Sequence, residues 1–309
     1  MESLHYNYVY GPVPSRRMGL SVGIEPIPAD TCNYSCVYCQ LGRTRHMTNE
    51  RKPFFEVGEM LSELEMYLKD VKEYDVVTLV GDGEPTLFKG LGDLIRGIKK
   101  ITDKPVAVIT NGALLYEKSV RDDLMEAHLV LPSLDAYDEK SFKAVNRPYG
   151  TIRFDDVFDG LKEFSRQYKG QLWIEIMLVK GMNDSQYALE AFRGMLGQIK
   201  YEKVFINAPV RPPAESYVET PEDDVIEEFA RGLKGYSINH LTESEFSSGI
   251  KDDFNAVLSI IGRHPMNQHE ISSFIKSRGG DPEEVLGRLG ADEKIDKLEY
   301  KGYVTYRMK

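Results

Sequence analysis

Three cysteines, the only ones among 309 residues, lie within eight positions of one another at Cys32, Cys36 and Cys39. Thiolates bind soft metals and iron–sulfur clusters, and one loop can turn all three toward a common centre. A structural zinc ion usually takes four ligands, and the spacing of His46 matches no common zinc pattern. The odd count and the lack of an export signal argue against a disulfide framework. The spacing therefore favours a four-iron cluster with one iron open to another ligand, and zinc is the alternative.

Three later segments combine glycine with acidic, amide or hydroxyl side chains. They are residues 81–85 (Gly-Asp-Gly-Glu-Pro), 110–112 (Thr-Asn-Gly) and 133–135 (Ser-Leu-Asp). In this order, after Cys-x-x-x-Cys-x-x-Cys with Tyr38 before the last cysteine, they resemble the radical S-adenosylmethionine (radical SAM) superfamily. The resemblance covers residues 8–250. Residues 8–30, which lead into the cysteine loop, resemble a branch of iron–sulfur oxidoreductases related to the wyosine-forming tRNA enzymes.

The resemblance implies that the cysteines hold a [4Fe–4S] cluster and that S-adenosylmethionine (SAM) chelates its fourth iron. The cluster would reduce SAM, and the resulting 5′-deoxyadenosyl radical would take a hydrogen atom from a substrate. Because no cysteine remains for a second cluster, we expect an external flavodoxin or ferredoxin as electron donor. Asp82 stands where the commoner motif has glycine. The implied cofactor contacts are Tyr38 near the adenine, Gly83 and Glu84 at the SAM amino group, Asn111, Ser133 and Asp135 at the ribose or carboxylate, and Asn207 at the adenine edge.

Alternating strands and helices must position these groups, and each of the later motifs follows a predicted strand. Apolar runs rich in β-branched residues predict buried strands, and amphipathic runs predict helices. The alternation predicts an α/β fold with a parallel sheet, open or closed as a barrel. The resemblance selects a partial (βα)6 TIM-type barrel, with functional groups at the carboxyl ends of the strands. We expect a turn at 11–17, strands at 19–27, 75–80, 105–110, 127–131, 172–179 and 203–207, and helices at 53–67, 91–101, 154–168, 188–199 and 223–233.

Residues 251–309 differ in character from residues 1–250 and predict a separate small domain, after a connector at 237–250. Short helices followed by a hairpin resemble a winged helix-turn-helix. Because the charges of this region are nearly balanced, we expect a substrate-docking module rather than a sequence-specific DNA-binding domain. The expected helices are 254–261, 268–275 capped by Asn267, 283–289 after Asp281-Pro282, and 292–298, and the expected hairpin is 300–306.

The formal net charge of −10 makes this chain a poor non-specific nucleic-acid binder. No apolar run approaches the ~20 residues that span a bilayer, and the first six residues show no export signal. With free cysteines, these features predict a cytoplasmic protein without a membrane partner. A basic patch near the cysteine loop predicts a cationic mouth for an anionic cofactor or substrate, and a solvated surface is the alternative. The patch comprises Arg16, Arg17, Arg43, Arg45, His46, Arg51 and Lys52.

The favoured function is a radical SAM enzyme that modifies tRNA or a nucleotide-like molecule. Wyosine ring formation is not expected, because it uses extra cysteines that this chain lacks. The alternatives are modification of a peptide docked by the C-terminal domain and a cluster-bearing redox regulator. Loop arginines can clamp a carboxylate or phosphate, and a desolvated lysine can form a Schiff base. The candidate substrate residues are Arg16, Arg17, Arg147, Lys180 and Arg211.

Overall fold

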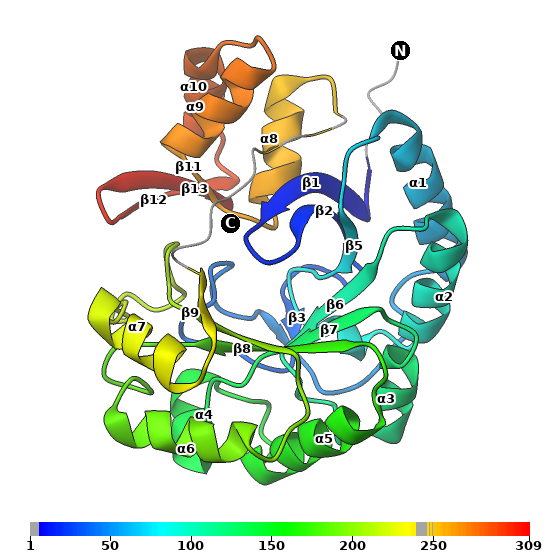
Figure 1. Cartoon of the computed structure of the whole chain (residues 1–309). Helices are drawn as coiled ribbons and strands as arrows, with labels where there is room; N and C mark the ends of the chain where they lie inside the picture. The colour runs from blue at the N-terminus through cyan, green and yellow to red at the C-terminus, as the bar shows by residue number, and fades with distance from the viewer. Residues whose placement is uncertain (1–5, 239–245, 247, 249) are drawn as a thin grey trace.

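The computed structural model describes residues 6–238, 246, 248 and 250–309, and its larger part is a curved sheet surrounded by helices (Figure 1). The parallel strands form from the runs rich in valine and isoleucine, because β-branched side chains pack well on a buried, pleated surface. The strands of the main sheet are β1 (Val9–Ser15), β2 (Gly19–Ile24), β5 (Val76–Leu79), β6 (Val106–Thr110), β7 (Leu129–Pro132), β8 (Gln171–Met177), β9 (Lys203–Asn207) and β10 (Tyr236–Ser237).

Amphipathic helices cover the outer face of this sheet. In α2 (Leu91–Ile101), the buried side chains of Leu91, Leu94 and Ile98 recur every three or four residues, so that one stripe faces the strands. The other helices of this part are α1 (Val57–Asp70), α3 (Lys118–Leu124), α4 (Glu139–Val145), α5 (Phe154–Gln167), α6 (Gln186–Leu196), α7 (Asp223–Gly232) and the short 3₁₀ helix η1 (Pro85–Leu87).

The main sheet runs in the order β1-β2-β5-β6-β7-β8-β9-β10. Only β1 is antiparallel to its neighbour, and from β2 to β10 every adjacent pair is parallel. Each of the six strands β2, β5, β6, β7, β8 and β9 is followed by at least one helix. Because β1 and β10 stand at opposite ends of the strand order, the sheet of the described residues is an open, partial barrel. This is the α/β architecture that the sequence predicts.

Successive side chains in a strand point to opposite faces of the sheet. One set packs beneath the helices in the main hydrophobic core, and the other set points into the barrel. Glu175 and Asn207 lie two residues beyond inward-facing aromatic residues of β8 and β9, so they point inward nearer the carboxyl ends. Below them, an apolar floor closes the barrel with Val76, Ala107, Leu129, Leu131, Trp173, Phe205 and Ile238.

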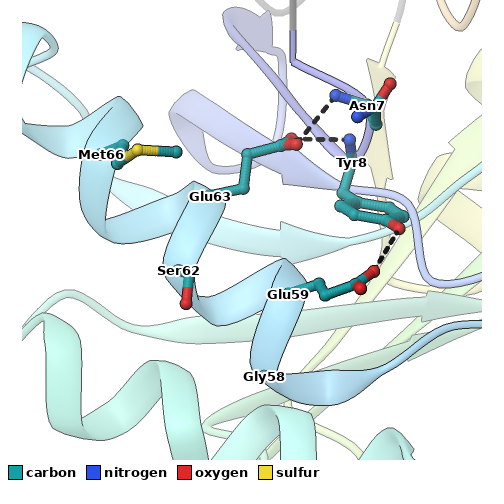
Figure 2. A pocket seen from close by; sticks show the side chains of 7 residues that line it. All are labelled: Asn7, Tyr8, Gly58, Glu59, Ser62, Glu63 and Met66. Atoms are coloured by element: carbon teal, nitrogen blue, oxygen red, sulfur yellow. Dashed lines mark hydrogen bonds between the residues drawn. The ribbon is translucent and has the colours of Figure 1, made fainter.

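A carboxylate of α1 anchors the segment that leads into β1. Glu63 accepts hydrogen bonds from the backbone N–H groups of Asn7 (2.9 Å), Tyr8 (2.6 Å) and Val9 (2.8 Å). Figure 2 shows Glu63 reaching from the helix to this backbone, with Glu59 one turn away at the Tyr8 hydroxyl. These bonds hold the start of β1 against α1.

The C-terminal part forms a second unit with its own hydrophobic core. Its order is one helix, one short strand, two helices and a hairpin, and its assignment as a winged helix stays a prediction. Val13 of β1 packs against this core, and α8 contacts β1 (Figure 1). Its sheet is antiparallel with the order β11-β13-β12. The elements are α8 (Asp253–Ile261), β11 (Met266–Asn267), α9 (Gln268–Ser277), α10 (Pro282–Ala291), β12 (Ile295–Tyr300) and β13 (Tyr303–Met308).

Two predictions about local structure are wrong. Residues 11–15, expected in a turn, belong to β1, where an edge strand tolerates proline because one side has no partner to bond. Residues 295–298, expected in a helix, belong to β12, because pairing with β13 outweighs the helix propensity of Lys297 and Leu298.

Some expectations cannot be compared with the structure. Residues 1–5 and most of the predicted connector at 237–250 lie outside the described residues, so the proposed boundary at 250 stays a prediction. Within the described part of the chain, every helix is too short or too polar to cross a lipid bilayer.

Candidate functional site

The three cysteines lie on one loop beyond the carboxyl end of β2. Cys32 ends the short strand β3 (Thr31–Cys32), which pairs with β4 (His46–Met47). The Cys39 N–H donates to the Cys36 carbonyl (3.2 Å), and the Val37 N–H donates to the Val145 carbonyl (2.9 Å). All three thiols are free and half-buried. The loop is therefore fixed by backbone hydrogen bonds at both ends.

Nitrogen donors lie near two of the three sulfur atoms. The Asn111 Nδ2 atom is 3.6 Å from Cys32 Sγ, and the backbone nitrogen of Tyr34 is 3.4 Å from the same sulfur. Asn146 Nδ2 lies 3.5 Å from Cys36 Sγ. Hydrogen bonds to cysteine sulfur are one way in which proteins tune iron–sulfur clusters. The sequence motif predicts Asn111 as a SAM contact, and it gives no sign of Asn146.

The arrangement of these thiols bears on which metal group they suit. Burial raises the pKa of the Cys32 thiol to about 12, and it also raises the pKa values of Cys36 and Cys39. Metal binding must therefore displace the thiol protons. Within the described residues, no three His, Cys, Asp or Glu side chains gather around one metal-sized point. Three thiolates are one fewer than the four protein ligands of a usual structural zinc site.

Segment 81–85 packs directly against the strand that carries Cys32. At Gly83, a Cβ atom would lie 1.8 Å from the Thr31 carbonyl oxygen, so no larger residue fits without a backbone shift. The N–H of Glu84 donates to that same oxygen (3.1 Å). The glycine motif thus places the carboxyl end of β5 in contact with the cysteine loop.

The Glu84 carboxylate is buried and fully engaged inside the protein. It accepts hydrogen bonds from the hydroxyl groups of Thr86 and Thr110 (both 2.6 Å) and from the Asn111 N–H (2.7 Å). Burial raises its pKa, although these hydrogen bonds oppose the shift. Glu84 therefore ties the segments after β5 and β6 together beside the cysteines.

Asp135 plays a similar role after β7. Its carboxylate accepts hydrogen bonds from the Tyr38 hydroxyl, from Asn146 Nδ2 (3.0 Å) and from the Met177 N–H (2.8 Å). Burial raises its pKa to about 6, against the lowering effect of these donors. Ser133, two residues earlier, is half-buried beyond the end of β7. Asp135 thus joins the cysteine loop, through Tyr38, to β8.

A cavity of about 360 Å³ connects the barrel interior with the cysteine loop. Tyr38 and Cys39 line it at the loop, and Asn207 lines it at the end of β9. Residues 15–18, at the turn between β1 and β2, form another wall of the cavity, and Arg263 and His264 of the C-terminal unit form a third. The cavity is therefore lined by residues far apart in the sequence. The charged and imidazole side chains of the lining are Arg16, Arg17, Glu175, Arg211, Arg263 and His264.

Three of these arginines pair with carboxylates: Arg17, Arg211 and Arg263, the last with Glu25 (2.8 Å). Arg17 forms an ion pair with Glu175 inside the barrel, while its Nε atom is buried without a hydrogen-bond partner among the described residues. Arg211 donates to the Pro265 carbonyl (2.6 Å) and pairs with Glu270 (3.1 Å). The Nε–H of Arg17 can therefore donate a hydrogen bond to a ligand in the cavity, whereas Arg211 links the barrel to the C-terminal unit.

His264 brings a neutral imidazole from the C-terminal unit to this cavity. Burial, followed by the charges of Arg211, Arg16 and Arg17, holds its pKa well below the usual range. Its Nε2 atom lies 2.6 Å from Arg211 Nη2. Because a guanidinium only donates, Nε2 is the acceptor and the proton is assigned to Nδ1.

Two predicted substrate residues lie outside the cavity. Arg147 pairs with Glu215 (2.5 Å), to which Arg43 also binds (2.7 Å). Lys180 is exposed and pairs with Glu222 (2.6 Å), which raises the lysine pKa. A Schiff-base lysine needs the opposite, a desolvated amine with a lowered pKa, so the structure gives no support to that role.

The predicted basic patch divides into two parts. Only Arg16 and Arg17 reach the cavity. Most of the other basic side chains pair with acids and do not form an open cationic mouth. Besides Arg43, these pairs are Arg45 with Asp30, Arg51 with Asp123 (2.5 Å) and Lys52 with Glu50 (2.9 Å).

Four residues of the site are absent from the predicted set: Asn146, Glu175, Arg263 and His264. Glu175 offers a signal in the sequence, because an acid inside an apolar strand is rarely buried without a partner. The residues next to Asn146, Arg263 and His264 in the sequence form no pattern that indicates a functional site. Only the fold brings these three to the cysteine loop or the cavity.

The fold and the site together define an α/β partial-barrel protein with a three-cysteine loop at the carboxyl ends of its strands. The chain matches the Radical SAM superfamily model over residues 27–191, more than half of its length. It belongs to the radical SAM superfamily and is an enzyme that binds a [4Fe–4S] cluster and SAM. Enzymes of this superfamily generally take an electron from an external donor such as flavodoxin.

Several relatives extend this result. A UPF0026 protein of Methanocaldococcus jannaschii is 32% identical over 308 residues, covering 96% of this chain and 94% of the relative. A protein of Brachyspira hyodysenteriae named GTPase Obg is 34% identical over 303 residues, and this chain spans only 45% of it. A GTP 3′,8-cyclase of Thermodesulfovibrio yellowstonii is 31% identical over 182 residues, covering 57% of this chain and 53% of the cyclase.

Solved structures agree on the fold. TYW1 with a lysine-pyruvate adduct bound has a TM-score of 0.53 and 18% sequence identity. The match covers 71% of this chain and 74% of that one. A radical SAM methyltransferase from Sphaerobacter thermophilus gives a TM-score of 0.52 with 16% identity, covering 70% of this chain and 64% of the methyltransferase.

Proposed function

We propose that Cys32, Cys36 and Cys39 each bind one iron of the cluster and leave the fourth iron to SAM. The support is the set of three free thiols on one fixed loop, with nitrogen donors near two of the sulfurs. With an electron from an external flavodoxin or ferredoxin, this pair of cofactors supplies a 5′-deoxyadenosyl radical that removes hydrogen from a substrate. The surrounding residues hold SAM, orient the substrate and exclude water.

In this proposal SAM lies along the carboxyl ends of the strands, beside the cysteine loop. Because both carboxylate oxygens of Glu84 and of Asp135 accept internal hydrogen bonds, these acids act by holding the backbone and Tyr38. Direct contacts then come from the backbone at Gly83 and from partly exposed side chains. The proposed cofactor site comprises Tyr38, Gly83, Glu84, Asn111, Ser133, Asp135 and Asn207, of which Glu84 and Asp135 act indirectly.

The substrate we propose is an anionic, nucleotide-like molecule or a single nucleotide of RNA. The observation that carries this proposal is the place of Arg16 and Arg17 in the cavity lining, where the buried Nε atom of Arg17 has no hydrogen-bond partner among the described residues. Guanidinium groups bind phosphate through paired hydrogen bonds. Arg16 and Arg17 are the proposed phosphate ligands, and Arg211 supports the wall through His264.

The size of the cavity favours a small substrate group. At about 360 Å³, it falls at the lower end of the range of ligand pockets, roughly 300–1,000 Å³. An RNA substrate would have to turn one base out of its stack to enter. The relationship to a GTP 3′,8-cyclase, whose name states a reaction of GTP, also favours a nucleotide. A peptide docked on the C-terminal unit is the alternative, favoured by the place of His264 in the cavity wall.

The test is anaerobic turnover with defined substrate classes. The protein is reconstituted with iron and sulfide, given SAM and dithionite, and assayed for 5′-deoxyadenosine with nucleoside phosphates, cell RNA or a peptide fraction. We expect nucleotides or RNA to raise the yield, and a Cys36→Ala protein to give none. Arg17→Gln should raise the KM for the stimulating nucleotide about tenfold, while Lys180→Gln should leave it unchanged.

Two results would change the proposal. Stimulation by the peptide fraction alone would replace the nucleotide by a peptide substrate and leave the cofactor chemistry intact. A protein with a full, reducible cluster that forms no 5′-deoxyadenosine under any condition would overturn the proposed function.

A further inference from the structure

A single carboxylate connects the glycine motif to the C-terminal unit. Glu25 lies just beyond β2, and its side chain is only 8% exposed. Its Oε1 atom accepts a hydrogen bond from the Asp82 N–H (2.8 Å). Its Oε2 atom accepts one from Arg263 Nε (2.8 Å), at the end of α8 and 238 positions further along the chain. One oxygen thus holds the loop after β5, and the other holds the C-terminal unit.

The Arg263 guanidinium is fixed on several sides. It lies 4.8 Å from the centre of the Tyr10 ring, and its Nη2 atom donates to the Asn7 carbonyl (3.3 Å). The Tyr10 ring in turn lies where a Cβ atom on Gly23 would stand, 2.2 Å from its nearest atom, so β2 needs glycine there. The surrounding fold therefore sets the position of Arg263, and through it the position of Glu25.

The charges around Glu25 make its ion pair with Arg263 important for the stability of this region. Burial, followed by the charge of Glu25, raises the pKa of Asp82 to about 8, while Arg263 opposes this shift. The carboxylates of Glu25 and Asp82 thus share a poorly solvated space with one guanidinium. Without Arg263, the Glu25 carboxylate would be a buried, unpaired charge beside Asp82, which is unfavourable. If the Glu25 side chain then turned toward water, it would lose its hydrogen bond from the Asp82 N–H.

We propose that Arg263 is a positioning residue for the SAM site, so that the C-terminal unit completes that site and does not only dock a substrate. It acts through Glu25, which fixes the backbone at residues 81–83 next to the cysteine loop. This inference rests on the proposed function, which places the backbone at Gly83 in contact with SAM. Arg263 itself touches no reacting atom in this scheme.

The test measures SAM affinity of the full-length, cluster-loaded protein by equilibrium dialysis, without turnover. Arg263→Gln and Glu25→Gln should each weaken SAM binding about tenfold, the loss expected for one hydrogen bond to a charged group. The double variant should bind no more weakly than either single variant, because both act through one connection. Arg263→Lys should recover part of the affinity. The change in the electron paramagnetic resonance signal of the reduced cluster on adding SAM gives a second readout.

Arg278→Gln is the matched control, because Arg278 pairs with Asp253 at 2.7 Å within the same C-terminal unit. It should leave SAM affinity unchanged even where it lowers the melting temperature. Wild-type affinity in Arg263→Gln, equal losses in Arg278→Gln, or additive losses in the double variant would each overturn the inference. A wild-type protein that binds its cluster but no SAM would overturn the proposed function as well. If Arg263→Gln does not fold, Glu25→Gln and Arg263→Lys decide the question.

Discussion

Replacing Gly83 by alanine tests the contact on which the whole site depends. The new Cβ would lie 1.8 Å from the Thr31 carbonyl oxygen and 2.8 Å from Ile27 Cδ1. Ordinary contact begins near 3.4 Å, so the segment would have to retreat by about 1.6 Å. The neighbour is backbone, and it cannot rotate away. The retreat would break the hydrogen bond from the Glu84 N–H to the Thr31 oxygen.

The expected cost follows from these two effects. Overpacking of a buried contact costs about 1–3 kcal/mol, and loss of the hydrogen bond adds about 1 kcal/mol. We therefore expect Gly83→Ala to lower the free energy of unfolding by about 2–4 kcal/mol. Because Thr31 precedes Cys32 directly, the same retreat should also weaken iron retention and SAM binding.

Urea unfolding of the metal-free protein measures the first effect, and iron content with equilibrium dialysis of SAM measures the second. Gly194→Ala is the control, since this exposed glycine of α6 has nothing within 4 Å of the new Cβ. That change should stabilise the protein by about 0.5–1 kcal/mol through helix propensity. If Gly83→Ala unfolds at the wild-type urea concentration and binds SAM normally, the reasoning about this contact is refuted.

Three further outcomes are expected. Asp82 has a pKa raised to about 8, so the native state keeps a proton that the unfolded chain releases, and stability falls as pH rises from about 4 to 8. Urea unfolding of the metal-free protein should show wild type losing about 1.4 kcal/mol per pH unit relative to Asp82→Asn between pH 5 and 7, and parallel curves would refute this. Tyr38→Phe removes a donor to the buried Asp135 carboxylate and should cost about 2 kcal/mol in the same assay at pH 7, whereas an unchanged midpoint would contradict that bond. Lys180→Gln should leave 5′-deoxyadenosine formation within twofold of wild type, because the lysine lies in a surface ion pair, and loss of turnover would restore its proposed substrate role.

Local patterns account for much of the barrel. The parallel strands follow apolar runs, and β9 and α2 have the predicted bounds, because burial and periodicity along the chain specify them. Helices α3 and α4 do not appear among the predictions, since each has seven residues and too few turns for a clear period. Helix propensity predicts the wrong element for residues 295–298, where strand pairing decides.

The class of chemistry can be predicted from the sequence. Three cysteines at fixed spacing indicate a cluster, and the glycine and acidic motifs after successive strands add the resemblance to the radical SAM superfamily that implies SAM. Both signals are local and ordered along the chain. The polar groups that surround the cysteines are known only from the folded structure. Asn146 reaches Cys36 across 110 positions, and Arg263 reaches Glu25 across 238. Such contacts depend on how the barrel and the C-terminal unit pack together, and no local pattern in a single sequence specifies that packing.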